Sequence, residues 1–315
     1  MVFTIAIDAR AIKECESLGR SGLSVVASML NSLDQNCLLI ECRKSTFSVE
    51  SLIRTVNKLA DSFTNDGVDY ATRNRLKATL KKLWMTGRVK SFRFEESFNN
   101  HHYPEGIVDS LANVVDQLIV SDECTHVTSN AVPLMRYSIS PFEWIRSKAC
   151  SEGVSKGRND CQIDKLLTDS FRTLLSWSDQ VHIIDYSLGV NWRDRDGIRN
   201  SNYTDAIPHW CSFFRSLRRE IQVVIRTLVP RGFESGEDVI KELIADITDE
   251  FMKNLGGSEI RVKVEISDKV HSRFLHACGF FIDIDRGIDI CYKNGSVRRT
   301  SFGFKRDRKL ESELG

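Results

Sequence analysis

The sequence lacks the features that mark a membrane protein, a secreted protein or a zinc ribbon. No apolar run approaches the roughly 20 residues that a transmembrane helix needs. The first residues have the length of a strand, without the basic region and long apolar core of a signal peptide. The nine cysteines are scattered and show no CxxC spacing, which argues against a zinc ribbon or disulfide framework and favours a reducing compartment. We therefore expect a soluble cytoplasmic protein.

The sequence also lacks an excess of charge of either sign, internal repeats and low-complexity tracts. The formal net charge is +1, so the bulk charge does not point to nucleic acid. The 315 residues, 41% of them hydrophobic, are enough for two ordinary cores. A polar stretch without periodicity follows the first half and is predicted to be a linker. We expect domains over residues 1–148 and 165–315, with the linker over 149–164.

The first apolar run, residues 4–7, ends on the acid Asp8. Because helical patterns follow it, this run predicts a buried parallel strand. Asp8 then lies at the carboxyl end of the strand, where open α/β sheets bind ligands. A carboxylate in that place is costly to bury unless a positive group joins it. Capping of the next helix is the alternative role for Asp8, and position alone does not decide between the two.

Helical periodicity and short apolar runs alternate through the rest of the first half, which predicts a parallel sheet with helices on its faces. The segments expected as strands are 37–42 and 125–130, and those expected as helices are 23–30, 49–56 and 105–115. Polar residues stand near the ends of these elements. Glu50 and Asp109 lie in the first turns of two helices, and Asn130 closes a strand. An acid in a first turn is favourable by itself, so Glu50 alone specifies no ligand.

Residues 71–94 contain basic side chains and no acid. A helix is expected there until Gly87, followed by an alternating strand over 89–94. Its apolar face is predicted from helical spacing as Leu76, Leu80, Leu83 and Trp84. The basic side chains on the rest of the helix are Arg73, Arg75, Lys77, Lys81 and Lys82. A solvated surface accounts for them, and a face that binds nucleic-acid phosphates is the functional alternative.

This order of motifs resembles a PIN domain, the small α/β fold of many metal-dependent ribonucleases. The resemblance covers about residues 1–148 and rests on Ile5-Ala6-Ile7-Asp8-Ala9-Arg10, Glu50, Asp109 and Val127-Thr128-Ser129-Asn130. It implies that Asp8, Glu50 and Asp109 are catalytic acids that bind Mg²⁺ or Mn²⁺, with RNA favoured over DNA as the substrate. Asn130 replaces a fourth carboxylate that the family often has, and Arg10 stands where Asn is usual. The replacement at Asn130 lowers the expected negative charge and weakens a second metal site, and the resemblance implies that Asn130 assists the three acids in catalysis.

Physical chemistry supports a cation at three converging acids. Two carboxylates about 4 Å apart repel by about 4 kcal/mol at an effective dielectric constant of about 20. Such groups therefore take up protons or hold a cation. Oxygen ligands favour Mg²⁺ or Mn²⁺ over zinc, and the cation would orient water and offset charge on a phosphodiester.

The second half predicts an α/β domain that ends in strands. Its expected helices are 165–175, 205–219 and 236–254, and its expected strands are 180–185, 221–225, 259–266, 270–277 and 279–285. His271 and Arg273 are two residues apart on one of these strands and would share a face. A histidine and a guanidinium together make a phosphate-sized site, and a satisfied surface pair is the alternative. Asp285 and Asp289 follow downstream and are predicted to belong to the same phosphate or partner site.

These motifs resemble the phospholipase-D-like domain at the C-terminal end of MIT-domain proteins, over about residues 165–305. The motifs are Ile183-Ile184-Asp185-Tyr186, His271-Ser272-Arg273 and Asp285-Arg286-Gly287-Ile288-Asp289. The resemblance implies an α/β domain with a mixed sheet that binds membranes or partners. Catalytic relatives carry His-x-Lys, whose histidine attacks phosphorus, whereas this chain has Arg273 and a single motif. Because arginine keeps its proton and forks onto phosphate, we favour recognition over catalysis.

The leading hypothesis is a metal-dependent nuclease, an endoribonuclease, whose second domain recognises phosphate or a protein partner or forms a homodimer. The resemblances suggest a bacterial toxin or antiviral defence effector. One alternative is a metal-independent phosphodiesterase with His271 as the nucleophile. The other is a non-catalytic module that binds nucleic acid, lipid or protein. A membrane surface is the less favoured partner.

Overall fold

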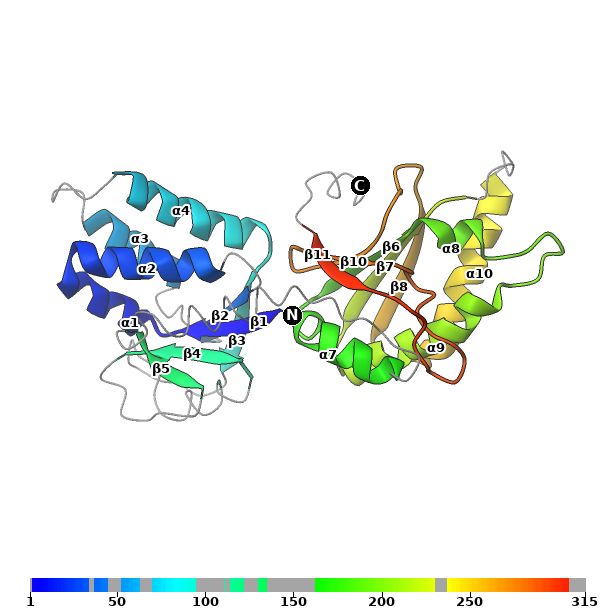
Figure 1. The fold of residues 1–315 in the computed structure, drawn as a ribbon, viewed down its shortest axis with the longest axis horizontal. Helices are drawn as coiled ribbons and strands as arrows, with labels where there is room; N and C mark the ends of the chain where they lie inside the picture. The colour runs from blue at the N-terminus through cyan, green and yellow to red at the C-terminus, as the bar shows by residue number, and fades with distance from the viewer. Residues whose placement is uncertain are drawn as a thin grey trace. The chain divides into compact units, whose positions relative to one another are not determined.

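A computed structural model describes residues 2–33, 37–44, 52–62, 70–94, 111, 114–121, 130–134, 162–229 and 237–305. The chain divides into two compact units, Met1–Ser151 and Glu152–Gly315, each built around its own sheet (Figure 1). Both units are α/β, as expected. Within the described ranges, none of the helices combines the length and apolar character that a membrane crossing requires.

The N-terminal unit contains a parallel sheet of order β3-β2-β1-β4-β5. The strands are β1 Phe3–Ile7, β2 Cys37–Lys44, β3 Val89–Phe94, β4 Gln117–Val120 and β5 Ala131–Pro133. Every residue of β1 is buried, which explains why its sequence is continuously apolar. The chain adds β2 and β3 on one side of β1 and then returns to add β4 and β5 on the other. The order of the strands therefore reverses between β1 and β4, which is where such sheets bind ligands.

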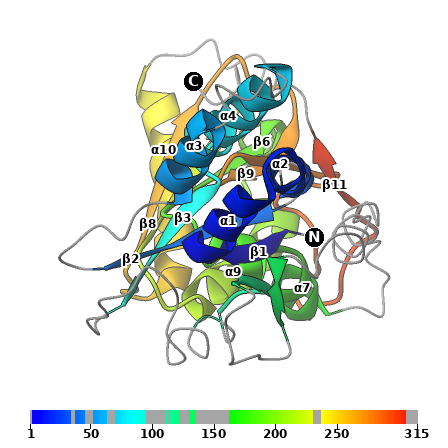
Figure 2. The ribbon, with the colours of Figure 1, turned by 90° about the vertical axis from the view of Figure 1, so that its left-hand side faces the viewer.

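Helices α2 Arg20–Leu33, α3 Leu52–Ser62 and α4 Tyr70–Met85 lie together on one side of this sheet (Figures 1 and 2). The short helix α1 Ala9–Glu14 and the 3-10 turn Cys15–Leu18 connect β1 to α2. The core joins both layers and includes Ile5, Met29, Leu39, Leu59 and Leu80. Burial of these apolar side chains is what holds the helices on the sheet.

The strand predicted over 125–130 is wrong at Asn130, its one described residue. Asn130 precedes β5, and the strand that pairs with β1 on the side away from β2 is β4. The four-residue run of β4 is too short to show a period, so no sequence pattern separates it from a loop. The pairing of β4 with β1 is a long-range contact that only the folded chain reveals.

The C-terminal unit contains a mixed sheet of order β11-β10-β9-β6-β7-β8. Strands β6 Gln180–Asp185, β7 Ile221–Thr227 and β8 Ile260–Ile266 are parallel. Strands β9 Arg273–Ala277, β10 Phe280–Ile284 and β11 Phe302–Lys305 are added antiparallel, starting from β6. The mixed sheet is as expected, and its parallel and antiparallel halves meet at β6.

Helices α7 Ile163–Leu175, α9 Ser201–Ser216 and α10 Glu237–Leu255 supply the apolar residues that cover this sheet, and α8 Tyr186–Val190 follows β6 directly. Buried aromatic rings tie α7 to α9, with Phe171 stacked on Trp210 at 6.1 Å and Trp210 on Phe214 at 5.9 Å. Helix α9 begins at Ser201, earlier than predicted, because the side chain of Asn200 accepts a hydrogen bond from the backbone N–H of Asn202.

Two histidines face each other across β6 and β9. His182 pairs with His276 in the register, and their ring centroids are 5.7 Å apart. The Nδ1 atom of each is buried and has no hydrogen-bond partner in the described part of the chain. Burial, and secondarily the proximity of His182, lower the pKa of His276 to about 4. His276 is therefore neutral in the folded protein at neutral pH.

We expect protonation of His276 to lower the stability of the C-terminal unit as the pH is lowered from about 6.5 to about 4. Between these two pH values His276 is protonated in the unfolded chain and neutral in the folded chain. Lowering the pH therefore favours unfolding. Melting curves at pH 7.5 and pH 5 check this. In His276→Phe the difference between the two melting temperatures should shrink, and an unchanged difference would contradict the assignment.

Candidate functional site

Asp8 lies at the carboxyl end of β1, the central strand of the first sheet, and only 2% of it is exposed. Its backbone N–H donates to Ile119 O at 2.8 Å, which joins it to β4. Its side chain caps α1, with Oδ1 accepting from the Arg10 N–H at 2.9 Å. The capping role is therefore real. It fixes the carboxyl group at the point where the strand order reverses.

Two residues outside the predicted motifs, Ser121 and Glu14, lie at the same end of the sheet. Ser121 follows β4 and is 1% exposed, and its hydroxyl donates to the carboxylate of Glu14 at the end of α1. Glu14 comes six residues after Asp8, on the helix that Asp8 caps. Carboxylate and hydroxyl oxygens are the donor type that suits Mg²⁺.

The other two predicted acids, Glu50 and Asp109, lie outside the described residues. Among the residues that are described, no group of three or more His, Cys, Asp or Glu side chains is placed to hold a metal ion. The predicted three-acid cluster therefore stays a prediction. Asp8 is its described member, and the oxygen chemistry at this end of the sheet is compatible with a hard cation.

Asn130 is not brought to Asp8. Its carbonyl accepts from the Leu118 N–H at 2.9 Å, and its side-chain amide donates to Val115 O at 2.9 Å. The register of β4 with β5 places Asn130 opposite Gln117, whereas the register of β1 with β4 places Asp8 opposite Val120. Three residues along a strand correspond to about 10 Å. Asn130 therefore lies toward the amino ends of the strands, because it begins β5 and does not close a strand.

The predicted basic helix is α4, and it carries all four proposed nucleic-acid-binding residues, Arg73, Lys77, Lys81 and Lys82. Leu76, Leu80 and Leu83 are buried as predicted. Trp84 is 50% exposed, contrary to the expectation that it belongs to the apolar face. Its position falls at the edge of that face, where the wide indole ring extends into solvent.

In the C-terminal unit, Asp185 ends β6 and is completely buried. Its carboxylate accepts three hydrogen bonds, from the Ser187 N–H at 3.1 Å, the Ser187 hydroxyl at 2.8 Å and the Ile288 N–H at 2.9 Å. Burial raises the pKa of Asp185, and these hydrogen bonds and the charge of Arg273 oppose the rise. The carboxyl group thus organises the loop after β10 and the start of α8 around one buried point.

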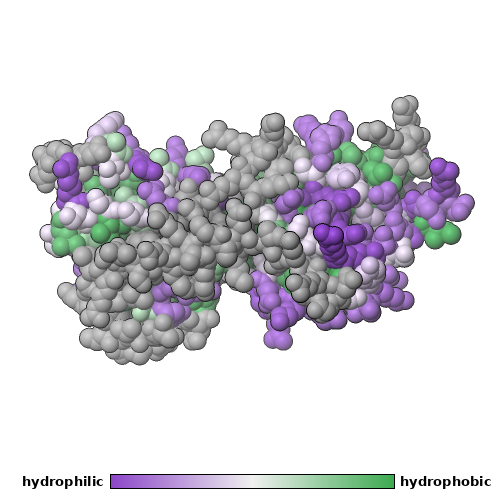
Figure 3. Space-filling view, in the orientation of Figure 1, coloured by the Kyte–Doolittle hydropathy of each residue, from purple (hydrophilic) through white to green (hydrophobic). Residues whose placement is uncertain are grey.

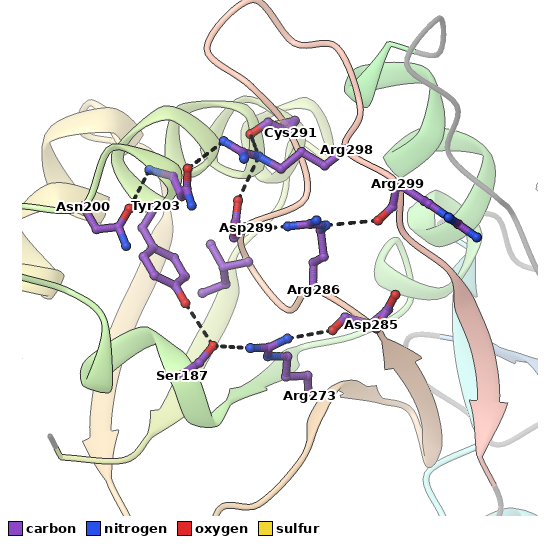
Figure 4. Close-up of polar contacts among 12 residues, drawn as sticks. Ser187, Asn200, Tyr203, Arg273, Asp285, Arg286, Asp289, Cys291, Arg298 and Arg299 are labelled. Carbon is purple, nitrogen blue, oxygen red and sulfur yellow. Dashed lines mark hydrogen bonds and ion pairs between the residues drawn. The ribbon is translucent and has the colours of Figure 1, made fainter. Parts of the chain in front are cut away.

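Arg273 lies at the start of β9, directly opposite Asp185 in the register. Its Nη1 donates to the Asp285 carbonyl at 2.9 Å and its Nη2 to the Ser187 hydroxyl oxygen at 2.7 Å (Figure 4). Its Nε is 3.5 Å from Asp185 Oδ1, and the guanidinium lies 4.6 Å from the centroid of the Tyr186 ring. The side chain keeps 26% of its surface exposed. The guanidinium is thus held in one orientation with part of it open to solvent.

The Ser187 hydroxyl connects this arginine to Tyr203, whose hydroxyl is 3.0 Å away (Figure 4). Ser187 gives its one proton to Asp185, so Tyr203 is the donor to Ser187. Burial, with the nearby charge of Asp185, raises the pKa of the Tyr203 hydroxyl, which keeps it protonated. Ser187 and Tyr203 were not predicted, although Ser187 follows the quoted Asp185-Tyr186 motif directly.

The downstream acids Asp285 and Asp289 lie in different surroundings. Asp285 contributes its backbone carbonyl, and its side chain is exposed. Asp289 is 14% exposed and lies 3.0 Å from Arg298 Nε and 3.6 Å from Arg286 Nη1. Burial raises the pKa of Asp289, and the two arginines oppose that rise. Asp289 is therefore part of an ionic cluster with arginines.

His271 is exposed and precedes β9, so the expectation that it shares a strand with Arg273 is wrong. The strand begins at Arg273 because the pairing of β9 with β6 ends at Asp185. The phosphate-sized pair of His271 and Arg273 is therefore not built by strand geometry. What surrounds Arg273 is Ser187, Tyr186 and Asp185.

Neither a scan against models of known protein families nor a search of curated proteins finds a match for this chain, so both sites are interpreted from their own chemistry.

Proposed function

We propose that the N-terminal unit is a metal-dependent nuclease that acts on RNA, with Asp8 as a ligand of Mg²⁺ or Mn²⁺. The observation that supports this most is the position of Asp8. It is a buried carboxyl group at the carboxyl end of the central strand, at the reversal of strand order. Ser121, which follows the adjacent strand β4, and Glu14, at the end of α1, add oxygen donors at the same end of the sheet.

A bound cation would orient a water molecule and offset charge on the phosphodiester. Asp8 would hold it, together with Glu50 and Asp109 as the further predicted ligands, and Glu14 is an additional oxygen donor at that end of the sheet. The capping bond from the Arg10 N–H to Oδ1 restrains the Asp8 carboxylate, so the ligand needs little rearrangement. The basic side chains of α4 would bind the nucleic-acid backbone through its phosphates.

We propose that the C-terminal unit recognises a phosphate group through Arg273. Its guanidinium is oriented by two hydrogen bonds and by the Tyr186 ring, and part of it faces solvent. Arginine does not lose its proton at any physiological pH, which suits binding better than acid–base chemistry. The exposed position of His271 away from β9 gives no support to the alternative in which His271 attacks phosphorus.

The test is cleavage of end-labelled single-stranded RNA and DNA by the full chain with Mn²⁺, with and without a chelator. We expect RNA cleavage that stops on chelation and returns when excess Mn²⁺ is added. Cleavage that survives chelation and is lost in His271→Ala would instead identify a metal-independent phosphodiesterase. Binding of RNA without turnover in any divalent metal would identify a non-catalytic binding module.

Arg273→Lys is expected to weaken binding of inorganic phosphate by about tenfold or more. A lysine ammonium cannot keep the hydrogen bonds to Ser187 and Asp285 and also present two parallel N–H groups to a phosphate. The expected size of the effect follows because a hydrogen bond to a charged group is worth about 1.5–3 kcal/mol. Isothermal titration calorimetry measures the affinity. Arg261→Lys is the matched control, because Arg261 is 77% exposed and pairs only with Glu220 in the described residues. Equal affinities for Arg273→Lys and wild type would reject the site.

A further inference from the structure

Helix α4 carries a stripe of aromatic and basic side chains along one side. The stripe consists of Tyr70, Arg73, Lys77, Lys81 and Trp84. These residues are spaced at i, i+3, i+7, i+11 and i+14, which places them on one side of a helix with 3.6 residues per turn. At 1.5 Å per residue, the two aromatic side chains at the ends are about 21 Å apart along the axis. The three basic side chains lie between them.

Both aromatic side chains of the stripe are exposed, Tyr70 by 70% and Trp84 by 50%. The adjoining face of α4, formed by Leu76, Leu80 and Leu83, is buried in the core of the unit. The helix is therefore anchored by its leucines and presents the stripe outward. Figure 3 shows hydrophilic and more apolar residues side by side on this part of the surface.

The basic side chains of the stripe differ in how far they are neutralised. The Arg73 guanidinium lies 5.5 Å from the centroid of the Tyr70 ring, and Lys77 Nζ pairs with Asp61 of α3 at 2.5 Å. Lys81 is exposed and has no ion-pair partner among the described residues, and the same is true of Arg75. An exposed pair such as Lys77 and Asp61 is weak and exchanges easily. The stripe therefore offers positive charge to an anionic partner.

We infer that the stripe on α4 binds single-stranded nucleic acid, with bases stacked on Trp84 and Tyr70 and phosphates next to Lys81 and its basic neighbours. Flat aromatic rings stack on any base, and a basic surface between them follows the backbone. Bases in a duplex are stacked on one another and are not free to do this. A membrane surface is disfavoured because insertion needs a free apolar face, and the leucine face of α4 is buried.

This inference rests on the proposed function in one respect, because the bound strand would be the substrate of the nuclease. Binding can nevertheless be measured without cleavage. The full chain is titrated into a fluorescein-labelled oligouridylate in chelator, and fluorescence anisotropy gives the affinity. Trp84→Ala and Tyr70→Ala are each expected to weaken binding about tenfold. Lys81→Gln is expected to lower the slope of log affinity against log salt by about 0.7.

Two control variants match these changes. Met85→Ala removes an apolar side chain that follows Trp84 in the sequence, is 72% exposed and has no aromatic face, and Lys253→Gln removes an exposed lysine from α10 of the other unit. Both should bind like wild type, and circular dichroism melting checks that every variant is folded. Unchanged affinity in both aromatic variants overturns the inference. So does an aromatic variant that loses binding to anionic lipid vesicles but keeps binding to RNA.

The outcomes for the stripe and for the nuclease are separable. Weaker binding in Trp84→Ala, in a protein that cleaves nothing with any metal, supports the stripe and rejects the nuclease. Normal binding in both aromatic variants, in a protein whose Mn²⁺-dependent cleavage is intact, rejects the stripe and supports the nuclease.

Discussion

Asp8→Asn is expected to lower Mn²⁺-dependent RNA cleavage about 1,000-fold and to leave the N-terminal unit folded. The substitution replaces a charged metal ligand with a neutral amide of the same shape. A cation contributes several kcal/mol of charge stabilisation to the transition state, and about 4 kcal/mol corresponds to about 1,000-fold in rate. Single-turnover cleavage with saturating Mn²⁺ measures the effect.

The Asp8→Asn substitution removes the charge of the side chain and keeps its role as a helix cap. Asparagine caps a helix about as well as aspartate, so its side-chain oxygen still accepts the Arg10 N–H, and the backbone bond to Ile119 is untouched. Asp8→Ala is the companion variant, because it also removes the cap and should cost about 1 kcal/mol of stability. Full activity in a folded Asp8→Asn protein would show that Asp8 is a helix cap and no more.

Gly287→Ala is expected to destabilise the C-terminal unit by about 3 kcal/mol or more, from two causes. Gly287 has a φ of +67°, a conformation that costs an L-residue about 1–2 kcal/mol. A Cβ atom there would also lie 2.2 Å from Oδ2 of the buried Asp185. The same oxygen accepts the Ile288 N–H, so the carboxyl group cannot move without losing that bond. A hydrogen bond to a charged group contributes about 1.5–3 kcal/mol.

Gly197→Ala is the matched control. Gly197 has a φ of +78°, and no atom lies within 4 Å of the position of its added Cβ. It therefore carries the backbone cost of about 1–2 kcal/mol without the collision. Thermal unfolding followed by circular dichroism compares the two variants, and Gly287→Ala should melt several degrees lower. Equal melting temperatures would mean that the carboxyl group of Asp185 is not confined as described.

Three of the proposed variants should each change a different measured quantity. The Asp8 variant is expected to lower turnover, the Arg273 variant to lower phosphate affinity, and the Trp84 variant to weaken binding of a single strand. A nuclease with a separate phosphate-recognition unit should show all three effects independently, because each residue lies in its own structural setting.

The sequence by itself determined the α/β class, a parallel first sheet and Asp8 at the end of β1. These features follow from local patterns, since a buried strand is continuously apolar and a surface helix repeats every 3.6 residues. Only the tertiary structure decided that β4 is the strand beside β1, that Asn130 lies away from Asp8 and that His271 lies outside β9. It also decided that Arg273 is held by Ser187 and Asp285. These are contacts between residues far apart in the chain, and neither composition nor period encodes which distant segments pair.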